Sequence, residues 1–182
     1  MRKSRLLIVF ILLCCALCSC TLMEKRISEQ ELITAFNNNY EQLNQCAEIL
    51  YSNADPWKTT IREERKYNWE LDLKEDYTQI FGKENWLIVK VTIDKFKPAS
   101  VAYHVHTIRD FDLPRVEFSF ISSDSKPSEK YWKMYVLYYI PTAHPIEGDK
   151  YEYIKELFAE GGVNNLIRLD DDWYYSIHEE NW

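Results

Sequence analysis

The feature that most constrains the fold of this chain is its hydrophobic period, which changes part-way along the sequence. Between residues 28 and 51 the apolar residues recur at alternating steps of four and three, the period of an α-helix. This stripe consists of Leu32, Phe36, Tyr40, Leu43, Ala47 and Leu50. Ser28 and Glu31 have the spacing of a capping box, which predicts where the helix begins. We therefore expect one long N-terminal helix, with Asn37–Asn39 on its solvated face.

The second half of the chain favours strands, because its apolar residues alternate with other residues at every second position. The alternation predicts four consecutive strands, at 87–94, 101–106, 116–120 and 131–140. Pro98 and Pro114 are expected to separate the first three of them as turns. Strands joined by such short connections indicate an antiparallel meander with one face on the core.

Shorter elements complete the predicted architecture. A strand is favoured at 68–71, and short helices are predicted at 72–81, ended by Gly82, and at 151–158. The segments on either side of Asp170–Asp172 predict a C-terminal hairpin. The fold class that follows is α+β: a long N-terminal helix packed on an antiparallel meander sheet, with short flanking helices and a C-terminal hairpin. This order of elements is similar to that of cystatin-like and NTF2-like domains. The resemblance carries no motif, so it transfers no functional residue.

The first twenty residues predict export across a membrane. The chain starts with the basic residues Arg2, Lys3 and Arg5. The apolar run that follows, at 6–17, suits a signal peptide and is shorter than the roughly 20 residues of a membrane-spanning helix. Leu17-Cys18-Ser19-Cys20 resembles the lipobox of bacterial lipoproteins, with Cys18 as a departure at the second position.

The lipobox resemblance implies a lipid anchor, including palmitate, on Cys20. It divides the chain into a signal peptide at 1–19, a short tether at 20–26 and a single α+β domain at 27–182. It also implies a place in the cell envelope. In proteins with this motif, an aspartate directly after the lipidated cysteine opposes export to the outer membrane. This chain has Thr21 at that position, so we expect the protein on the outer membrane, facing the periplasm.

The charge of the chain restricts its partners. Residues 1–19 contain three of the 22 basic residues and none of the 29 acidic ones, so the chain from Cys20 has a net charge of −10. Such a surface lacks the cations that neutralise phosphates, and it is repelled by anionic lipid head groups. We expect no binding of nucleic acid, attachment to the membrane through the lipid alone, and a basic protein as partner.

The cysteines agree with an exported protein that has no internal disulfide. Four of the five are Cys14, Cys15, Cys18 and Cys20, so Cys46 is the one cysteine in the predicted domain. A lone exposed thiol would form intermolecular disulfides in an oxidising compartment, so Cys46 is predicted to be buried. A zinc site built from cysteines is excluded by their number. We expect no cofactor.

Two histidines are the candidates for metal binding or catalysis. His104 and His106 are two positions apart on a predicted strand, hence on the same face, with Asp110 and Asp112 just beyond. A stable metal site needs three or four ligands, so we predict that the pair binds no metal. The chain also lacks the Gly-x-Ser-x-Gly, His-Glu-x-x-His, P-loop and Gly-x-Gly-x-x-Gly motifs. The alternative remains a lipid-anchored periplasmic hydrolase that uses these histidines and nearby carboxylates.

Large aromatic side chains occupy both faces of two predicted strands. They form either an aromatic core whose Tyr hydroxyls reach water or an exposed surface of the kind that anchors protein interfaces. The candidate interface residues are Tyr131, Trp132, Tyr135, Tyr138, Trp173 and Tyr175. The function predicted from these patterns is a non-catalytic protein-binding lipoprotein of the envelope, of the immunity, inhibitor or assembly-accessory type.

Overall fold

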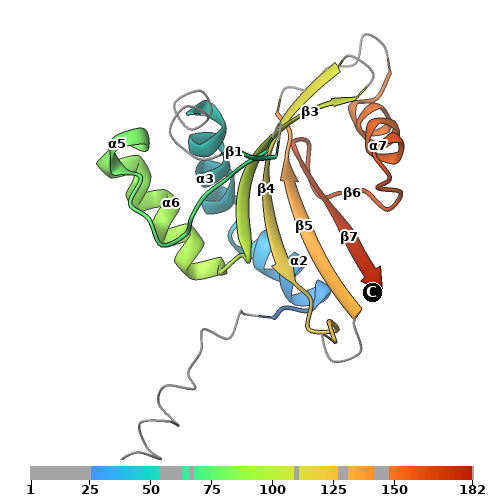
Figure 1. The fold of residues 1–182 in the computed structure, drawn as a ribbon, viewed down its shortest axis with the longest axis horizontal. Coiled ribbons are helices and arrows are strands. Elements are labelled where there is room, and N and C mark those ends of the chain that lie inside the picture. Colours follow the sequence, from blue (N-terminus) through green and yellow to red (C-terminus); the bar gives the residue numbers. More distant parts are fainter. Residues whose placement is uncertain are drawn as a thin grey trace, which may run out of the picture.

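The computed structural model describes residues 26–53, 63–65, 68–108, 111–126, 131–141 and 148–181 (Figure 1). The predicted signal peptide and Cys20 lie outside the described residues, as does Asp110. The side chains of His106 and Asp112 also lie outside the described part of the chain.

The core of the fold is a seven-stranded antiparallel sheet with the order β1-β2-β3-β4-β5-β7-β6. Its strands are β1 (Glu63–Arg65), β2 (Asn68–Glu70), β3 (Ser100–Ile108), β4 (Phe111–Ile121), β5 (Tyr131–Tyr139), β6 (Ile167–Arg168) and β7 (Trp173–Asn181). The meander of β3, β4 and β5 and the hairpin of β6 and β7 are as predicted. With the helices described next, this sheet confirms the α+β class.

Helices cover both faces of the sheet (Figure 1). They are α2 (Glu29–Asn38), α3 (Tyr40–Ser52), α5 (Thr78–Phe81), α6 (Lys83–Phe96) and α7 (Lys150–Glu160). The helices α2, α3 and α6 bury their apolar faces in one cluster with the inward residues of the sheet, and Cys46 is buried there as predicted. On the opposite face, Ile154, Leu157 and Phe158 of α7 pack on β4, β5 and β7 in a second cluster. The expectation that the sheet has one face on the core is therefore wrong.

The predicted N-terminal helix is two helices that meet at Asn39. The capping box at its start is present, with Ser28 N donating to Glu31 Oε2 at 2.8 Å. At Asn39 the backbone leaves the helical region, with φ −137° and ψ 25°, while its side-chain Nδ2 donates to the carbonyl of Ala35 at 2.8 Å. An asparagine side chain that binds a nearby carbonyl competes with the helical hydrogen bonds, so the helix ends and restarts there.

The strand predicted at 87–94 lies within helix α6, so that prediction is wrong. The buried residues of α6 include Trp86, Val89, Ile93 and Phe96, at steps of three and four. Leu87 and Val91, which had suggested alternation, are 62 % and 49 % exposed. The β-branched residues of this segment favour a strand intrinsically, but packing of the helical stripe against α3 overrides that preference.

Two smaller predictions also change. Pro114 lies inside β4, opposite Val105 of β3, and not at a turn. The short helix α5 begins at Thr78 and not near Asp72, because Asp72 accepts a hydrogen bond from Lys74 N in a turn. It ends at Phe81 as predicted, and Gly82 has the positive φ of 79° that glycine adopts without strain.

Candidate functional site

Burial removes four of the six residues of the predicted aromatic interface. Tyr135, Tyr138, Trp173 and Tyr175 are at most 3 % exposed, so the prediction that they form a surface is wrong. Three of them pack among the residues beneath α2 and α3, whereas Tyr138 packs edge-on against Phe158 of α7, with ring centroids 4.8 Å apart. The sequence left open which strand faces are covered, and α7 covers the face that had been expected to be free. Tyr131 and Trp132, at the start of β5, remain partly exposed.

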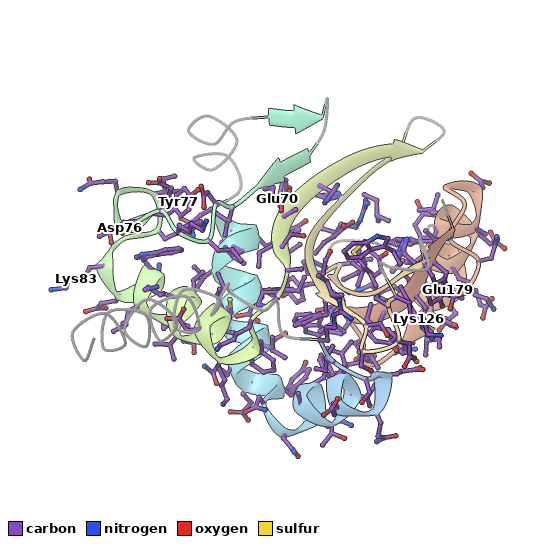
Figure 2. The ribbon with its side chains drawn as sticks, turned by 60° about the horizontal axis from the view of Figure 1, so that its bottom comes forward. Glu70, Asp76, Tyr77, Lys83, Lys126 and Glu179 are labelled. Atoms are coloured by element: carbon purple, nitrogen blue, oxygen red, sulfur yellow. The ribbon has the colours of Figure 1, made fainter. Side chains whose placement is uncertain are left out.

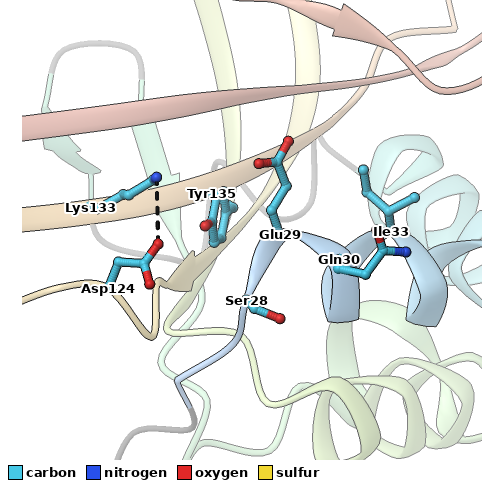
Figure 3. A pocket seen from close by; sticks show the side chains of 7 residues that line it. All are labelled: Ser28, Glu29, Gln30, Ile33, Asp124, Lys133 and Tyr135. Atoms are coloured by element: carbon cyan, nitrogen blue, oxygen red, sulfur yellow. Dashed lines mark ion pairs between the residues drawn. The ribbon is translucent and has the colours of Figure 1, made fainter.

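A pocket of about 360 Å³ lies where α2 begins, facing the first half of β5 (Figure 3). Its lining consists of Ser28, Glu29, Gln30, Ile33, Asp124, Lys133 and Tyr135. The capping box holds the first turn of α2 in place on one side of the pocket, and β5 provides Lys133 and Tyr135 on the other. This volume is at the lower end of the range for small-ligand sites, and it is large enough to accept a side chain of a bound protein.

This end of the molecule carries the carboxylates of Glu29, Asp124 and Glu179, with the cations Arg26 and Lys126 close by, next to Ser125 and Tyr131. Lys133 is the one cation among the pocket-lining residues, and its Nζ lies 3.7 Å from Asp124 and 3.5 Å from Glu179. Partial burial lowers the pKa of Lys133, but the neighbouring Tyr135 and then Glu179 outweigh this effect, so the net shift is upward. The cation is therefore neutralised by its neighbours, and the carboxylate of Glu29 adds further negative charge. We call this end, made of residues 28–33, Asp124, Tyr131, Lys133 and Glu179, the acidic end. Trp132 points to the opposite face of the sheet, because side chains alternate along a strand.

The start of the described chain is fixed next to the same pocket. Ile27 N donates to the carbonyl of Ile121 at 3.0 Å, and Ser123 N donates to the carbonyl of Ile27 at 2.8 Å. The guanidinium of Arg26 donates to the carbonyl of Ser125 at 3.0 Å. The backbone on the N-terminal side of the pocket is thus bound to the end of β4 and the loop that follows it.

His104 belongs to a second polar group, on the opposite face of the sheet. Its Nε2 lies 3.1 Å from Glu117 Oε2, and Arg115 Nε lies 2.6 Å from Glu117 Oε1. Burial raises the pKa of Glu117, but the charge of Arg115 and the hydrogen bond from His104 together hold it at about 2. The Arg115 guanidinium also lies 5.4 Å from the ring centroid of Phe158 on α7. His104 therefore belongs to an ion-pair cluster that joins β3, β4 and α7.

A hydroxyl–imidazole group lies next to this cluster. Tyr138 OH, Ser176 Oγ and His178 Nε2 are each 2.8 Å from the other two. Ser176 and His178 have the spacing of a nucleophile and its base, but Ser176 is fully buried and its Oγ also contacts the Tyr138 hydroxyl. The group can hold β5 and β7 together, and a buried hydroxyl does not reach a substrate.

Neither metal ligands nor relatives point to an activity. Among the described residues, no three His, Cys, Asp or Glu side chains are grouped so that they could hold a metal ion. No protein-family model, curated protein or solved structure matches the chain. The likeness to cystatin-like and NTF2-like domains therefore stays a prediction. In the same described ranges, no helix has the length and apolar character needed to cross a membrane.

The acidic end was missed by sequence reasoning, apart from Tyr131. Glu29, Asp124 and Lys133 come from a helix, a loop and a strand that are far apart in the chain, and no spacing in the sequence relates them. The available signal was the capping box at Ser28, which marks a helix start but does not say what faces it.

Proposed function

We propose that this protein is a lipid-anchored component of the bacterial cell envelope, and that its acidic end binds a cationic protein without catalysing a reaction. The observation that carries the proposal is the position of the acidic end beside Arg26 and Ile27. Five residues lie between Arg26 and the expected lipid on Cys20, so the six steps along the chain span about 20 Å when fully extended. The pocket would therefore work close to the membrane, on the outer membrane facing the periplasm.

The charge and the side chains of the acidic end favour a protein partner. Carboxylates at the rim raise the association rate with a cationic protein, and their effect weakens with salt because the Debye length is roughly 8 Å at physiological ionic strength. Tyr131 is partly exposed on the same face of β5 as Lys133, and aromatic residues of this kind supply binding free energy when a partner covers them. The net charge of −10 from Cys20 onward disfavours nucleic acid.

The contacts of His104 weigh against the alternative of a hydrolase. Its imidazole is bound to Glu117, which also forms an ion pair with Arg115, so both partners of this carboxylate hold the sheet together. Ser176, the hydroxyl nearest to an imidazole on β7, is buried. Both arrangements support a binding module over an enzyme.

The anchor is tested by labelling with radioactive palmitate. Cys20→Ala should lose the label and move from the membrane to the soluble fraction, because it removes the thiol that carries the lipid. Cys18→Ala is the matched control, since it removes a neighbouring thiol of the same segment and should keep the label. Mass spectrometry that finds an unmodified N-terminus at another residue would contradict the anchor.

The binding role is tested by cross-linking the anchored protein in intact cells. Wild type should capture a basic protein, and capture should fall with rising salt and in the double variant Glu29→Gln/Asp124→Asn. Capture that is unaffected by salt and by both substitutions would rule out the acidic end as the binding surface. The matched control is Glu156→Gln, on the exposed side of α7.

A further inference from the structure

Strand β7 extends well past the strand that covers its outer side. The two residues of β6 pair only with Tyr174 and Tyr175, whereas β5 pairs with β7 along its whole length, to Tyr131 opposite Asn181. No other strand in the described part of the chain pairs with the outer side of β7. In Figure 1 no ribbon lies outside the final half of β7, which ends at the C-terminus. We call residues 179–181 of this strand the open edge.

The backbone groups that point outward along the open edge can be identified. The carbonyl of Trp173 accepts a hydrogen bond from Leu169 N on the β6 side, at 2.8 Å. The carbonyl of Ile177 accepts one from the side chain of Asn165 at 2.7 Å. Because alternate residues of a strand direct their N–H and C=O groups to the same side, Glu179 and Asn181 also point outward. In the part of the chain that the structure describes, no strand pairs with the outward backbone groups of Glu179 and Asn181, so this edge is a template for another strand.

We propose that the open edge binds an extended segment of a cationic protein as an additional strand of the sheet. This inference rests on the proposed function and gives its partner a binding mode, in which backbone hydrogen bonds supply affinity and side chains supply specificity. Glu179 contacts the pocket-lining Lys133, so the open edge continues into the acidic end. Figure 2 shows Glu179 and Lys126 on the side of the molecule away from Asp76, Tyr77 and Lys83.

Charge decides which strand fits. A second copy that paired antiparallel about Glu179 would place two Glu179 side chains opposite each other, and like charges in that position are destabilising. A segment with Lys or Arg at alternate positions would instead place its cations on the face that carries Glu179. The carboxylate of Glu29 lies on the same face, where it accepts a hydrogen bond from Tyr175 OH at 2.5 Å.

The test uses two variants at one position and a defined probe. Glu179→Pro removes the outward N–H together with the charge, and proline is tolerated at such edge positions because the ladder with β5 does not use this N–H. Glu179→Gln is the matched control, which removes the charge and keeps the N–H. The protein is purified in mild detergent as the cell produces it. The probe is a short peptide of alternating lysine and threonine, compared with the same peptide N-methylated at alternate residues.

If a strand adds, wild type binds the unmethylated peptide, and the exchange of the Glu179 and Asn181 amide hydrogens slows by at least about tenfold. Glu179→Gln should weaken binding a few-fold, and Glu179→Pro by about tenfold more, at an unchanged thermal midpoint. The N-methylated peptide should fail to bind.

Three results would overturn strand addition. Equal affinities of the two variants and of the two peptides would show that cations bind at the acidic end without adding a strand, which leaves the proposed function intact. If no peptide slows amide exchange at Glu179, strand addition is also rejected. The proposed function is tested independently of this result, and it fails if cross-linking captures no basic protein. A wild-type dimer that becomes a monomer in Glu179→Pro would assign the edge to a second copy.

Discussion

The indole Nε1 of Trp173 donates a 3.0 Å hydrogen bond to Oδ1 of Asn44, which joins the first residue of β7 to the middle of α3. The ring itself is fully buried and packs against Phe36 and Tyr139, with centroids 5.4 and 5.2 Å away. An indole needs a partner for its N–H when it is buried, and Asn44 supplies it. The aromatic residues of β7 therefore hold the helical layer to the sheet.

We expect Trp173→Ala to lower the free energy of unfolding by about 3–5 kcal/mol, because it leaves a large cavity in the main cluster. Asn44→Ala should cost about 1–3 kcal/mol, since the buried indole N–H then has no acceptor. Urea denaturation measures both changes. Trp132→Ala, at a partly exposed ring, is the comparison and should change stability by less than about 1 kcal/mol. A Trp173→Ala variant as stable as wild type would contradict this account of the core.

Glu117 should make the protein sensitive to acid. Its pKa in the folded state is about 2, below the ordinary value of 4.5, so the carboxylate stabilises the fold above pH 4.5. This contribution, about 3 kcal/mol, is lost as the pH falls from 4.5 to about 2. Glu117→Gln has no such proton to bind, so its free energy of unfolding should fall less steeply over that range than that of wild type.

Chemical denaturation at a series of pH values measures the slope for Glu117. Glu156→Gln, on the exposed side of α7, should keep the slope of wild type. Equal slopes for wild type and Glu117→Gln would show that the contacts with Arg115 and His104 do not stabilise the charged carboxylate.

The thiol of Cys46 should not react in the folded protein. Burial raises its pKa to about 12, and the side chain is fully covered by the main cluster. Thiolate is the reactive form, so iodoacetamide at neutral pH should leave residue 46 unmodified in the native state and modify it in urea. Peptide mapping by mass spectrometry distinguishes Cys46 from the other cysteines. Rapid native modification would contradict the burial of α3 against the sheet.

His104 is expected to bind no metal, since its Nε2 faces the carboxylate of Glu117 and Arg115 occupies the other oxygen. Elemental analysis of the purified protein should find well under one zinc, copper or nickel ion per chain. His104→Ala should leave that content unchanged. A stoichiometric metal that disappears in this variant would overturn the prediction and favour the hydrolase.

The sequence by itself determined the elements whose signals are local. The capping box at Ser28, the glycine at position 82 and the alternation along β3 and β5 each act through neighbouring residues, and each is found where it was predicted. The burial of Cys46 was also predicted, because a lone exposed thiol would form intermolecular disulfides in an oxidising compartment.

Tertiary structure decided what local signals left ambiguous. The residues at 87–94 satisfy both a helical and a strand period, and packing against α3 selected the helix. Asn39 ends a helix because its side chain binds Ala35, which the apolar stripe does not reveal. Helix α7 covers the second face of the sheet and thereby buries Tyr138. The acidic end forms where residues of α2, β5 and β7 meet. These outcomes depend on contacts between residues distant in the chain, and no pattern of neighbouring residues records such contacts.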